Sequence, residues 1–456
     1  MDRTAQTEPG SFLHWKRNVW MMVISQILVM TGFCAAMPFI PLFLKEGLGI
    51  ANDGERGLYM SMFSFFGMFG YGVFNPIWGS LSDRFGVKPM LLRGTFLTAF
   101  FFPMMAYVTH VWMLIALRFV TAACAGTTVA AQTLLVKNTP EDKQGLSLGL
   151  LSTAYFSGVT LGNVLGGMVV TYYGYEKTFW LCGILYFAAG IFVLFAKDDY
   201  IPGKAQPEKI PQAKRFHRYR HSVLPAFTLG VWLLMLQTLL MGIAFSFEVP
   251  YVTMLIEKIV GIREAAFWTG IESASCALAS LLSGMLLGYL SDRVRPLRLI
   301  LPILIVTAVC LLVQVQTPGF FKEPMVSWSL FGKTFQINLN FILFTVFRML
   351  RLLVLGGSGA VFMKLISNTT PKRKRGSVLG YRSTAYNIGS MIASFTAGWV
   401  VYSCGDVSSA FYVAAVLVIL LIPVTVWIVK KAMNQPFYQA HSPFGARYLK
   451  KQAEEE

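Results

Sequence analysis

The residues GSLSDRFGVK, at positions 79–88, decide how the rest of the chain is interpreted. They form a tight, charged turn between two apolar segments, each long enough to cross a bilayer. A degraded copy, GYLSDRVRPLR, returns at residues 288–298. The aspartates Asp83 and Asp292 are 209 positions apart (292 − 83 = 209), which is almost half of the 456 residues. One signature at equivalent places in two halves indicates a duplicated chain.

The composition is that of a membrane protein. Hydrophobic residues make up 55% of the chain, charged residues only 13%, and the mean hydropathy is +0.57. A soluble globular protein usually has about 25% charged residues. Apolar runs of 18 or more residues recur along the whole length, which is typical of helices that span a bilayer core about 30 Å thick. Short loops and two tails account for the rest, so we expect no large soluble domain.

These runs predict an all-α membrane protein with twelve transmembrane helices in two pseudo-symmetric six-helix bundles. The expected crossings are residues 18–44, 58–81, 89–109, 111–136, 145–171, 177–197, 223–255, 264–290, 297–316, 338–366, 376–402 and 407–431. The predicted division of the chain is an N-terminal tail (1–17), a first bundle (18–197), a linker (198–222), a second bundle (223–431) with an outer insertion near 317–337, and a C-terminal tail (432–456).

The net charge of +17 follows the membrane topology. Basic residues gather in every second loop, and the positive-inside rule places those loops and both termini in the cytoplasm. We expect a plasma (bacterial inner) membrane location and contact of the basic linker with anionic lipid head groups. No aromatic-basic surface accompanies the charge, so no nucleic-acid partner is predicted. Six cysteines stand singly, without metal-ligand spacing, and neither a metal nor a cofactor is predicted.

The two halves can be aligned residue by residue. At a shift of 209, Pro41 falls on Pro250 and Gly79 on Gly288. After the insertion the shift becomes 230 to 231, so that Arg118 falls on Arg348 and GLSLGLLSTAYFSG (145–158) on GSVLGYRSTAYNIG (376–389). Parallel six-helix repeats predict a two-bundle transporter with its site at the interface of the bundles.

The sequence also resembles a known family. GSLSDRFGVK resembles the loop 2–3 signature of the major facilitator superfamily, and STAYFSGVTLGNVLGG (152–167) is similar to the fifth-helix motif of its twelve-helix drug:proton antiporters, the multidrug-efflux branch. The start, with MPFIPLFL at 37–44, resembles the same branch. Two positions depart from the motifs: Asn163 replaces a proline, and Ala122 replaces a glycine that here stands at Gly126.

The resemblance implies a conformational network around the loop signature. Asp83 would face the N-terminus of the eleventh helix, and Asp292 that of the fifth, only while the cytoplasmic side is closed. The expected members of the network are Gly79, Asp83, Arg84, Gly86, Lys88, Arg93, Gly288, Asp292 and Arg293. Small residues spaced along the fifth and eleventh helices predict close helix packing. They are Gly158, Gly162, Gly166, Gly167, Gly389 and Gly398.

Ionisable groups at membrane depth are candidates for proton coupling or for binding a charged substrate. They are Arg118, Glu248, Glu272, Arg348 and Arg351. The resemblance links the Arg118 position to proton relay. A structural ion pair between the acids and Arg348 or Arg351 is the competing interpretation. Lys364 and Arg382 are expected to snorkel to the cytoplasmic face. Polar cavity candidates are Gln26, Gln132, Gln237, Tyr386 and Asn387.

We therefore predict a secondary active transporter that works by alternating access, exports amphipathic small molecules in exchange for protons, and acts as a monomer. The alternative is an importer or exchanger of a polar metabolite such as an organic anion, a sugar or a lipid precursor. A site with more arginine than carboxylate suits anionic, zwitterionic or neutral solutes better than lipophilic cations. A membrane enzyme or transport-fold receptor is a distant alternative. All five histidines lie in tails or loops, so no enzyme activity is expected.

Reporter fusions made after Asp83 and after Asp292 test this duplicated topology. Both aspartates lie in basic loops, so we expect both reporters on the cytoplasmic face. Fluorescent protein, which folds inside, and alkaline phosphatase, which is active outside, read the two faces independently. Fusions that place the aspartates on opposite faces would contradict the two-bundle prediction.

Overall fold

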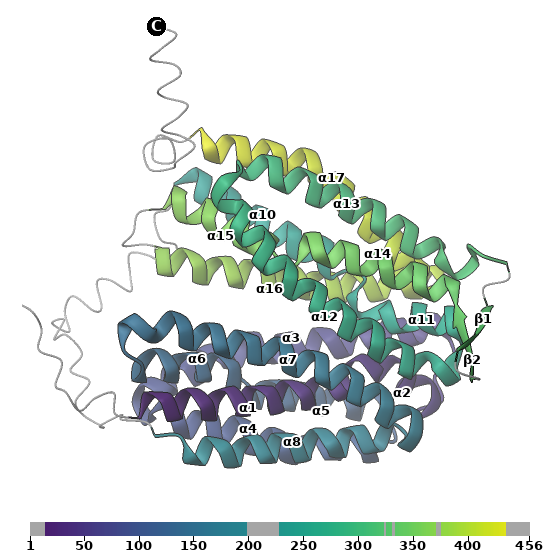
Figure 1. The fold of residues 1–456 in the computed structure, drawn as a ribbon, viewed down its shortest axis with the longest axis horizontal. Coiled ribbons are helices and arrows are strands. Elements are labelled where there is room, and N and C mark those ends of the chain that lie inside the picture. The colour runs from purple at the N-terminus through teal and green to yellow at the C-terminus, as the bar shows by residue number, and fades with distance from the viewer. Residues whose placement is uncertain (1–13, 198–227, 323–324, 331–332, 371–374, 435–456) are drawn as a thin grey trace, which may run out of the picture.

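The computed structural model describes residues 14–197, 228–322, 325–330, 333–370 and 375–434. The predicted linker at 198–222 and nearly all of both predicted tails lie outside these residues. Helices of the first half form one layer and helices of the second half another, and the two layers meet most closely near the hairpin β1–β2 (Figure 1). We call this the hairpin end, and the opposite end, where the layers diverge, the linker end.

The first bundle contains six helical crossings. Its elements are α1 (Trp15–Ala36), η1 (Met37–Phe39), α2 (Ile40–Glu46), α3 (Asp53–Phe85), α4 (Val87–Met104), η2 (Met105–Tyr107), α5 (Val111–Cys124), α6 (Thr127–Asn138), α7 (Glu141–Tyr173) and α8 (Tyr175–Phe195). Short turns at positive-φ glycines, Gly86 and Gly174, join α3 to α4 and α7 to α8. Such turns suit glycine because it has no Cβ to clash.

The second bundle repeats this order. Its elements are α10 (Leu229–Ser246), η3 (Val249–Tyr251), α11 (Val252–Val260), α12 (Ile262–Arg293), α13 (Pro296–Gln316), η4 (Thr317–Gly319), β1 (Met325–Leu330), β2 (Lys333–Asn338), α14 (Leu339–Leu355), α15 (Ser358–Thr369), α16 (Arg375–Cys404) and α17 (Ser408–Met433). Ten described stretches are long and apolar enough to span a membrane. The stretches α14–α15 and α16 are the less apolar remainder of the repeat, so the chain is an integral multi-pass membrane protein.

The charged stretch at residues 79–88 is mostly helix, which corrects the prediction of a turn. Helix α3 continues through it to Phe85, and only Gly86, with φ 95°, leaves the helix. Nothing between Gly79 and Phe85 breaks a helix, because the segment contains neither proline nor a second glycine. Asp83 and Arg84 therefore occupy the last turn of α3, and Lys88 lies in the first turn of α4.

Four crossings are interrupted, at equivalent places in the two halves. The first and seventh are broken by η1 and η3, which contain Pro38 and Pro250. The fourth and tenth are broken at Gly126, with φ 104°, and at Gly356, and these positions are repeat equivalents (126 + 230 = 356). Interrupted helices at matching positions are typical of transporters, where they flank the substrate path.

The outer insertion predicted near 317–337 contains the strand pair of the described chain. β1 and β2 pair antiparallel, from Met325 opposite Asn338 to Leu330 opposite Lys333. The Asn338 side chain accepts hydrogen bonds from the backbone N–H groups of Asn340 and Phe341, which caps α14. It also donates to the Ile259 carbonyl at 3.0 Å, so the hairpin is tied to the end of α11.

The glycines of the fifth crossing, α7, allow close backbone contact with α1. A Cβ at Gly158 would lie 2.6 Å from the Ile27 carbonyl oxygen, and one at Gly162 would lie 2.5 Å from that of Thr31. Gly166 meets Ala35 in the same way. In the second half, Gly389 of α16 packs against Leu239 of α10. Small residues thus let these helices approach closely.

Two members of the same stripes pack between the bundles instead. A Cβ at Gly167 of α7 would lie 2.9 Å from the Ala266 carbonyl oxygen of α12. Gly398 of α16 lies against Ser61 of α3. These glycines are repeat equivalents (167 + 231 = 398). The two helix pairs that cross between the bundles, α7 with α12 and α16 with α3, therefore each have a glycine at the matching position of their contact.

Gly162→Ala tests the packing of α7 on α1. The added methyl group would overlap the Thr31 carbonyl, so we expect a loss of about 1–3 kcal/mol of stability. Tryptophan fluorescence of the purified protein should show a lower Tm. Gly149→Ala is the matched control, because a Cβ there meets nothing within 4 Å. Equal melting temperatures for the two variants would show that close approach is not the role of this stripe.

Candidate functional site

The hairpin end is closed by ion pairs between the bundles. Glu257, at the end of α11, lies 2.6 Å from Arg56 of α3 and 2.5 Å from Lys45 of α2. The Arg56 side chain is only 1% exposed and also contacts Asp53 at 2.6 Å. Removing one partner of such a buried pair leaves an uncompensated charge, which costs about 3–5 kcal/mol. These contacts therefore oppose separation of the bundles at this end.

A second pair extends the closure. Lys258 of the second bundle lies 3.3 Å from Asp53 of the first and also binds Asp406. Burial alone would raise the pKa of Asp406, but hydrogen bonds from the Lys258 side chain and the Ser408 backbone outweigh it and lower this pKa. A lowered carboxyl pKa means that the ionised form is favoured, so this pair is retained at neutral pH and lost only as the pH falls through the lowered value.

From the ion pairs toward the linker end, polar contacts continue across the bundle interface. The Tyr251 hydroxyl lies 3.2 Å from Ser61 Oγ and 3.3 Å from the Gly57 carbonyl oxygen of α3. Thr253 donates to the Pro38 carbonyl at 2.7 Å. Ser61 donates to the backbone of Ser394 on α16. The interface is thus sealed from the charged cluster down to Ser394.

In the part of the chain that the structure describes, glycines near the linker end lie in open space. Cβ atoms built on Gly79 of α3, Gly145 and Gly149 of α7, and Gly284 and Gly288 of α12 would meet nothing within 4 Å. The same three helices make tight cross-bundle contacts toward the hairpin end, at Gly57, Gly167 and Gly270. This conformation is therefore closed at the hairpin end and parted at the linker end.

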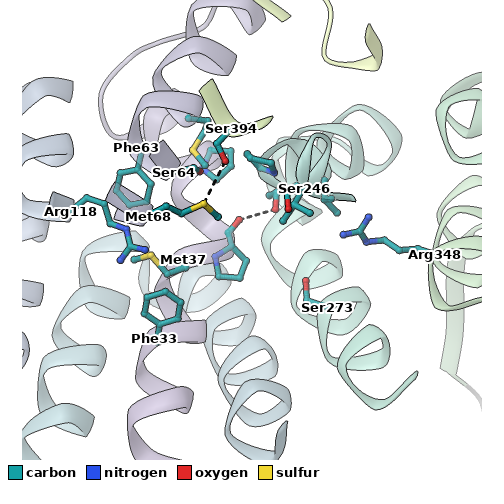
Figure 2. A pocket seen from close by; sticks show the side chains of 17 residues that line it. Phe33, Met37, Phe63, Ser64, Met68, Arg118, Ser246, Ser273, Arg348 and Ser394 are labelled. Atoms are coloured by element: carbon teal, nitrogen blue, oxygen red, sulfur yellow. Dashed lines mark hydrogen bonds between the residues drawn. The ribbon is translucent and has the colours of Figure 1, made fainter. Parts of the chain in front are cut away.

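Two adjoining cavities lie between the bundles, just below the sealed region. The smaller has a volume of about 340 Å³ and the larger about 660 Å³. They share Met68, Ser246, Val249 and Arg348, so they form one central space. Figure 2 shows Arg118 and Arg348 approaching the smaller cavity from opposite sides. The remaining residues of its lining are largely apolar, including Phe33, Met37, Met60 and Phe63.

The second bundle holds its membrane charges in one buried network. Glu248 binds Arg351 and lies 3.1 Å from Arg348 Nη1. Arg348 Nε also forms an ion pair with Glu272 Oε1 at a distance of 2.7 Å. The Nε–H bond does not point at this oxygen, so the contact is not a hydrogen bond. Glu272 also accepts from Cys276 Sγ at 3.1 Å. Two acids and two arginines thus compensate one another beside the central cavity, joining α12, α14 and the break after α10.

Arg118 of the first bundle has a different environment. Its guanidinium lies among the rings of Phe33 (5.3 Å), Phe63 (5.4 Å) and Tyr71 (5.7 Å). Gly67 gives it room, since a Cβ there would lie 2.5 Å from Arg118 Nε. Among the described residues, no carboxylate pairs with it, and its Nε has no hydrogen-bond partner.

The five predicted cavity polar residues separate into two groups. Tyr386 and Asn387 line the larger cavity. Gln26 donates to Thr128 at 3.1 Å and Gln237 to Thr425 at 2.5 Å, so both join helices of their own bundle and lie outside the lining. Gln132 is exposed on α6 and lines neither cavity. A buried amide is as readily satisfied between packed helices as at a cavity, which is why composition could not separate the two groups.

The basic members of the predicted network contact their own bundles in this conformation. Lys88 donates to the Leu194 carbonyl at 2.8 Å. Arg93 lies 3.5 Å from the Trp78 ring and donates to the Ala125 carbonyl, which the break of the fourth crossing leaves available. Arg84 and Arg293 lie over Phe85 and Tyr289 in the last turns of α3 and α12. The predicted contacts of this network across the bundles belong to a state closed at the linker end and remain a prediction.

Sequence reasoning missed the charged cluster at the hairpin end and the position of Arg382. Lys45, Arg56 and Glu257 carry opposite charges in the two halves of the chain, and this was the available signal. Arg382 was expected to snorkel, but it is half-buried and lines the larger cavity. On α16, one turn separates it from Tyr386, which lines the same space.

Glu257→Gln tests the closure of the hairpin end. The buried Arg56 would lose one of its two carboxylates, so we expect the hairpin end to open more often. Ser246→Cys, in a chain whose native cysteines are replaced by serine, reports this opening through an impermeant maleimide added from the hairpin side. Its labelling should be at least about tenfold faster in the Glu257→Gln variant. Exposed Glu55→Gln is the control, and equal labelling of the two variants would contradict the assignment.

Comparison with known proteins agrees with this architecture. The chain is 26% identical over 409 residues to the multi-drug resistance efflux pump PmrA homolog of Lactococcus lactis, covering 88% of this chain and 93% of that protein. It is 29% identical over 311 residues to the multidrug resistance protein MdtG of Serratia proteamaculans, covering 67% of this chain and 74% of that protein.

Solved structures share the fold at low sequence identity. The POT family transporter PepTSo superposes with a TM-score of 0.70 at 14% identity, over 92% of this chain and 99% of its own. A bacterial homolog of the human lysosomal transporter Spinster, in an inward-facing conformation, gives 0.67 at 13% identity, over 93% and 98%.

The family profile described as Major Facilitator Superfamily matches residues 22–335 and 324–438. With two six-helix layers, a shared central cavity and a profile match over most of its length, the chain is a transporter, not an enzyme, and belongs to the major facilitator superfamily.

Proposed function

We propose that this transporter exports amphipathic small molecules in exchange for protons by alternating access. The observation that carries the proposal is the central cavity, which is sealed at the hairpin end, adjoins two buried acids, and lies between bundles parted at the linker end. Efflux is supported by the relatives named multidrug resistance proteins. In this cycle the ion pairs of Glu257 break while the linker end closes.

Glu272 is the proposed proton acceptor. It is almost completely buried, and within the described residues Arg348 is its only cationic contact. Glu248, by contrast, is held by both arginines. The neighbouring Ser273 lines the smaller cavity and donates to Glu272 at 3.0 Å, which joins the acid to the substrate space. Protonation of Glu272 would release Arg348, which lines both cavities, to a new partner.

The lining supports an amphipathic substrate. Apolar side chains such as Met37, Met60 and Phe63 provide surface for a hydrophobic body, while Arg118, Arg348 and Asn387 provide polar contacts. Pockets of this kind bind mainly by apolar contact, and a few polar groups fix orientation. Methionine adapts to different shapes, which suits a range of substrates.

We further propose that the linker end is cytoplasmic, that the membrane is the plasma (bacterial inner) membrane, and that the protein acts as a monomer surrounded by lipid. The basic residues around the helix junctions at Arg84–Lys88 and Arg293–Arg298 support this orientation by the positive-inside rule. Exchange or import of a polar metabolite is the second candidate, and the excess of arginine over carboxylate in the lining favours it.

Everted membrane vesicles test proton-coupled export. We expect at least one of a panel of cationic, neutral and anionic amphiphiles to collapse a preset pH gradient, measured as recovery of acridine-dye fluorescence. In the Glu272→Gln variant, which cannot take up or release this proton, the collapse should fall to the rate of vesicles without the protein. Glu264→Gln, an exposed acid on the same helix, should behave as the unmodified protein. A gradient that no compound affects would contradict proton-coupled export.

A further inference from the structure

The two repeats differ in how they compensate a buried arginine. Arg348 of the second bundle is compensated by Glu248 and Glu272. At the shift of 209, the first-bundle equivalents of these acids are Phe39 and Phe63 (248 − 209 = 39; 272 − 209 = 63). Arg118, the equivalent of Arg348, therefore has a phenylalanine ring at 5.4 Å where its counterpart has a carboxylate.

Arg118 is nevertheless deeply buried. It is 8% exposed, lines the smaller cavity, and is directed toward it (Figure 2). Aromatic faces attract a cation more weakly than a carboxylate does at this depth. A buried charge without a counter-ion is costly in a membrane protein, and such a group is expected to meet its partner in a ligand.

Arg382 supplies a second uncompensated cation in the same space. It lines the larger cavity, its Nε has no hydrogen-bond partner, and no ion pair to it is present among the described residues. Its guanidinium lies beside Gly359 in the first turn of α15, where the helix N-terminus adds positive potential. No aspartate or glutamate is among the described residues that line either cavity.

We infer that the transported molecule is an anionic amphiphile, and that Arg118 and Arg382 bind its charged head group. The head group is a carboxylate, a sulfonate or a phosphate, since each accepts hydrogen bonds from guanidinium N–H groups. The apolar body lies against Met37, Met60 and Met68. This inference rests on the proposed transport function and narrows it from amphipathic molecules in general to those with a negative charge.

Four probes with one apolar body test this assignment: pyrenebutyrate, pyrenebutyl phosphate, pyrenebutanol and pyrenebutyl-trimethylammonium. Binding to the purified full chain is followed by energy transfer from tryptophan to pyrene. We expect one of the anions to bind at least about tenfold more tightly than the ammonium probe, as loss of a charged hydrogen bond predicts. The tighter of the two anions identifies the head group.

Variants assign the effect to the two arginines. Arg118→Gln and Arg382→Gln should each weaken anion binding about tenfold and leave pyrenebutanol binding unchanged, whereas Arg118→Lys should retain most of the affinity. Arg263→Gln, an exposed arginine of α12, is the control. Equal binding of ammonium and anionic probes to the unmodified protein would overturn the inference, and this comparison needs no variant to fold. Equal weakening of anion and alcohol by both glutamine variants would also overturn it.

Flux measurements separate this inference from the proposed function. In proteoliposomes, a pH gradient should drive the anionic probe and not the ammonium probe. Gradient-driven flux of the ammonium probe alone would overturn the anionic class and leave proton-coupled transport standing. Tight, arginine-dependent binding of the anion without any gradient-driven flux would support the site and overturn the coupling.

Discussion

The contacts of Glu257 with Arg56 and Lys45 hold the two halves of this transporter together at one end. A buried ion pair adds little net stability compared with apolar packing, but removing one partner is costly because the other charge is left buried and unpaired. That property suits a gate, because the pairs must separate together with the whole interface. In this conformation these contacts close the hairpin end, while the bundles are parted at the linker end.

Close contacts at small residues, next to the ion pairs of the hairpin end, form an interface on which the bundles can tilt. Gly167 lies against the backbone of α12, and Gly398 lies against the small Ser61 side chain of α3, so both crossed helix pairs approach closely. Interfaces of small residues have little interdigitation to undo when two helices change their angle. The duplicated chain therefore has two equivalent crossed helix pairs, each with a matching glycine, on either side of one cavity.

The charges, in contrast, break that symmetry. Arg348 is compensated within its own bundle by Glu248 and Glu272, whereas Arg118 is surrounded by aromatic rings. One half of the duplicated chain thus keeps a carboxylate that could exchange a proton, and the other keeps a cation that could meet a ligand. Arg348 lines both cavities and also touches both acids, so it connects the buried charges to the central space.

The sequence alone determined that the chain is an all-α membrane protein and which family it belongs to, because hydrophobic runs and turn glycines act locally along the chain. It also identified the membrane-embedded charges. Only the tertiary structure decided which charges meet: Arg56 and Glu257, which the sequence did not single out, are 201 positions apart. It also decided that Tyr386 lines a cavity, whereas the polar side chains of Gln26 and Gln237 bind neighbouring helices. Side-chain partners follow from how helices pack, rotate and break, and these depend on contacts between distant segments that no local pattern encodes.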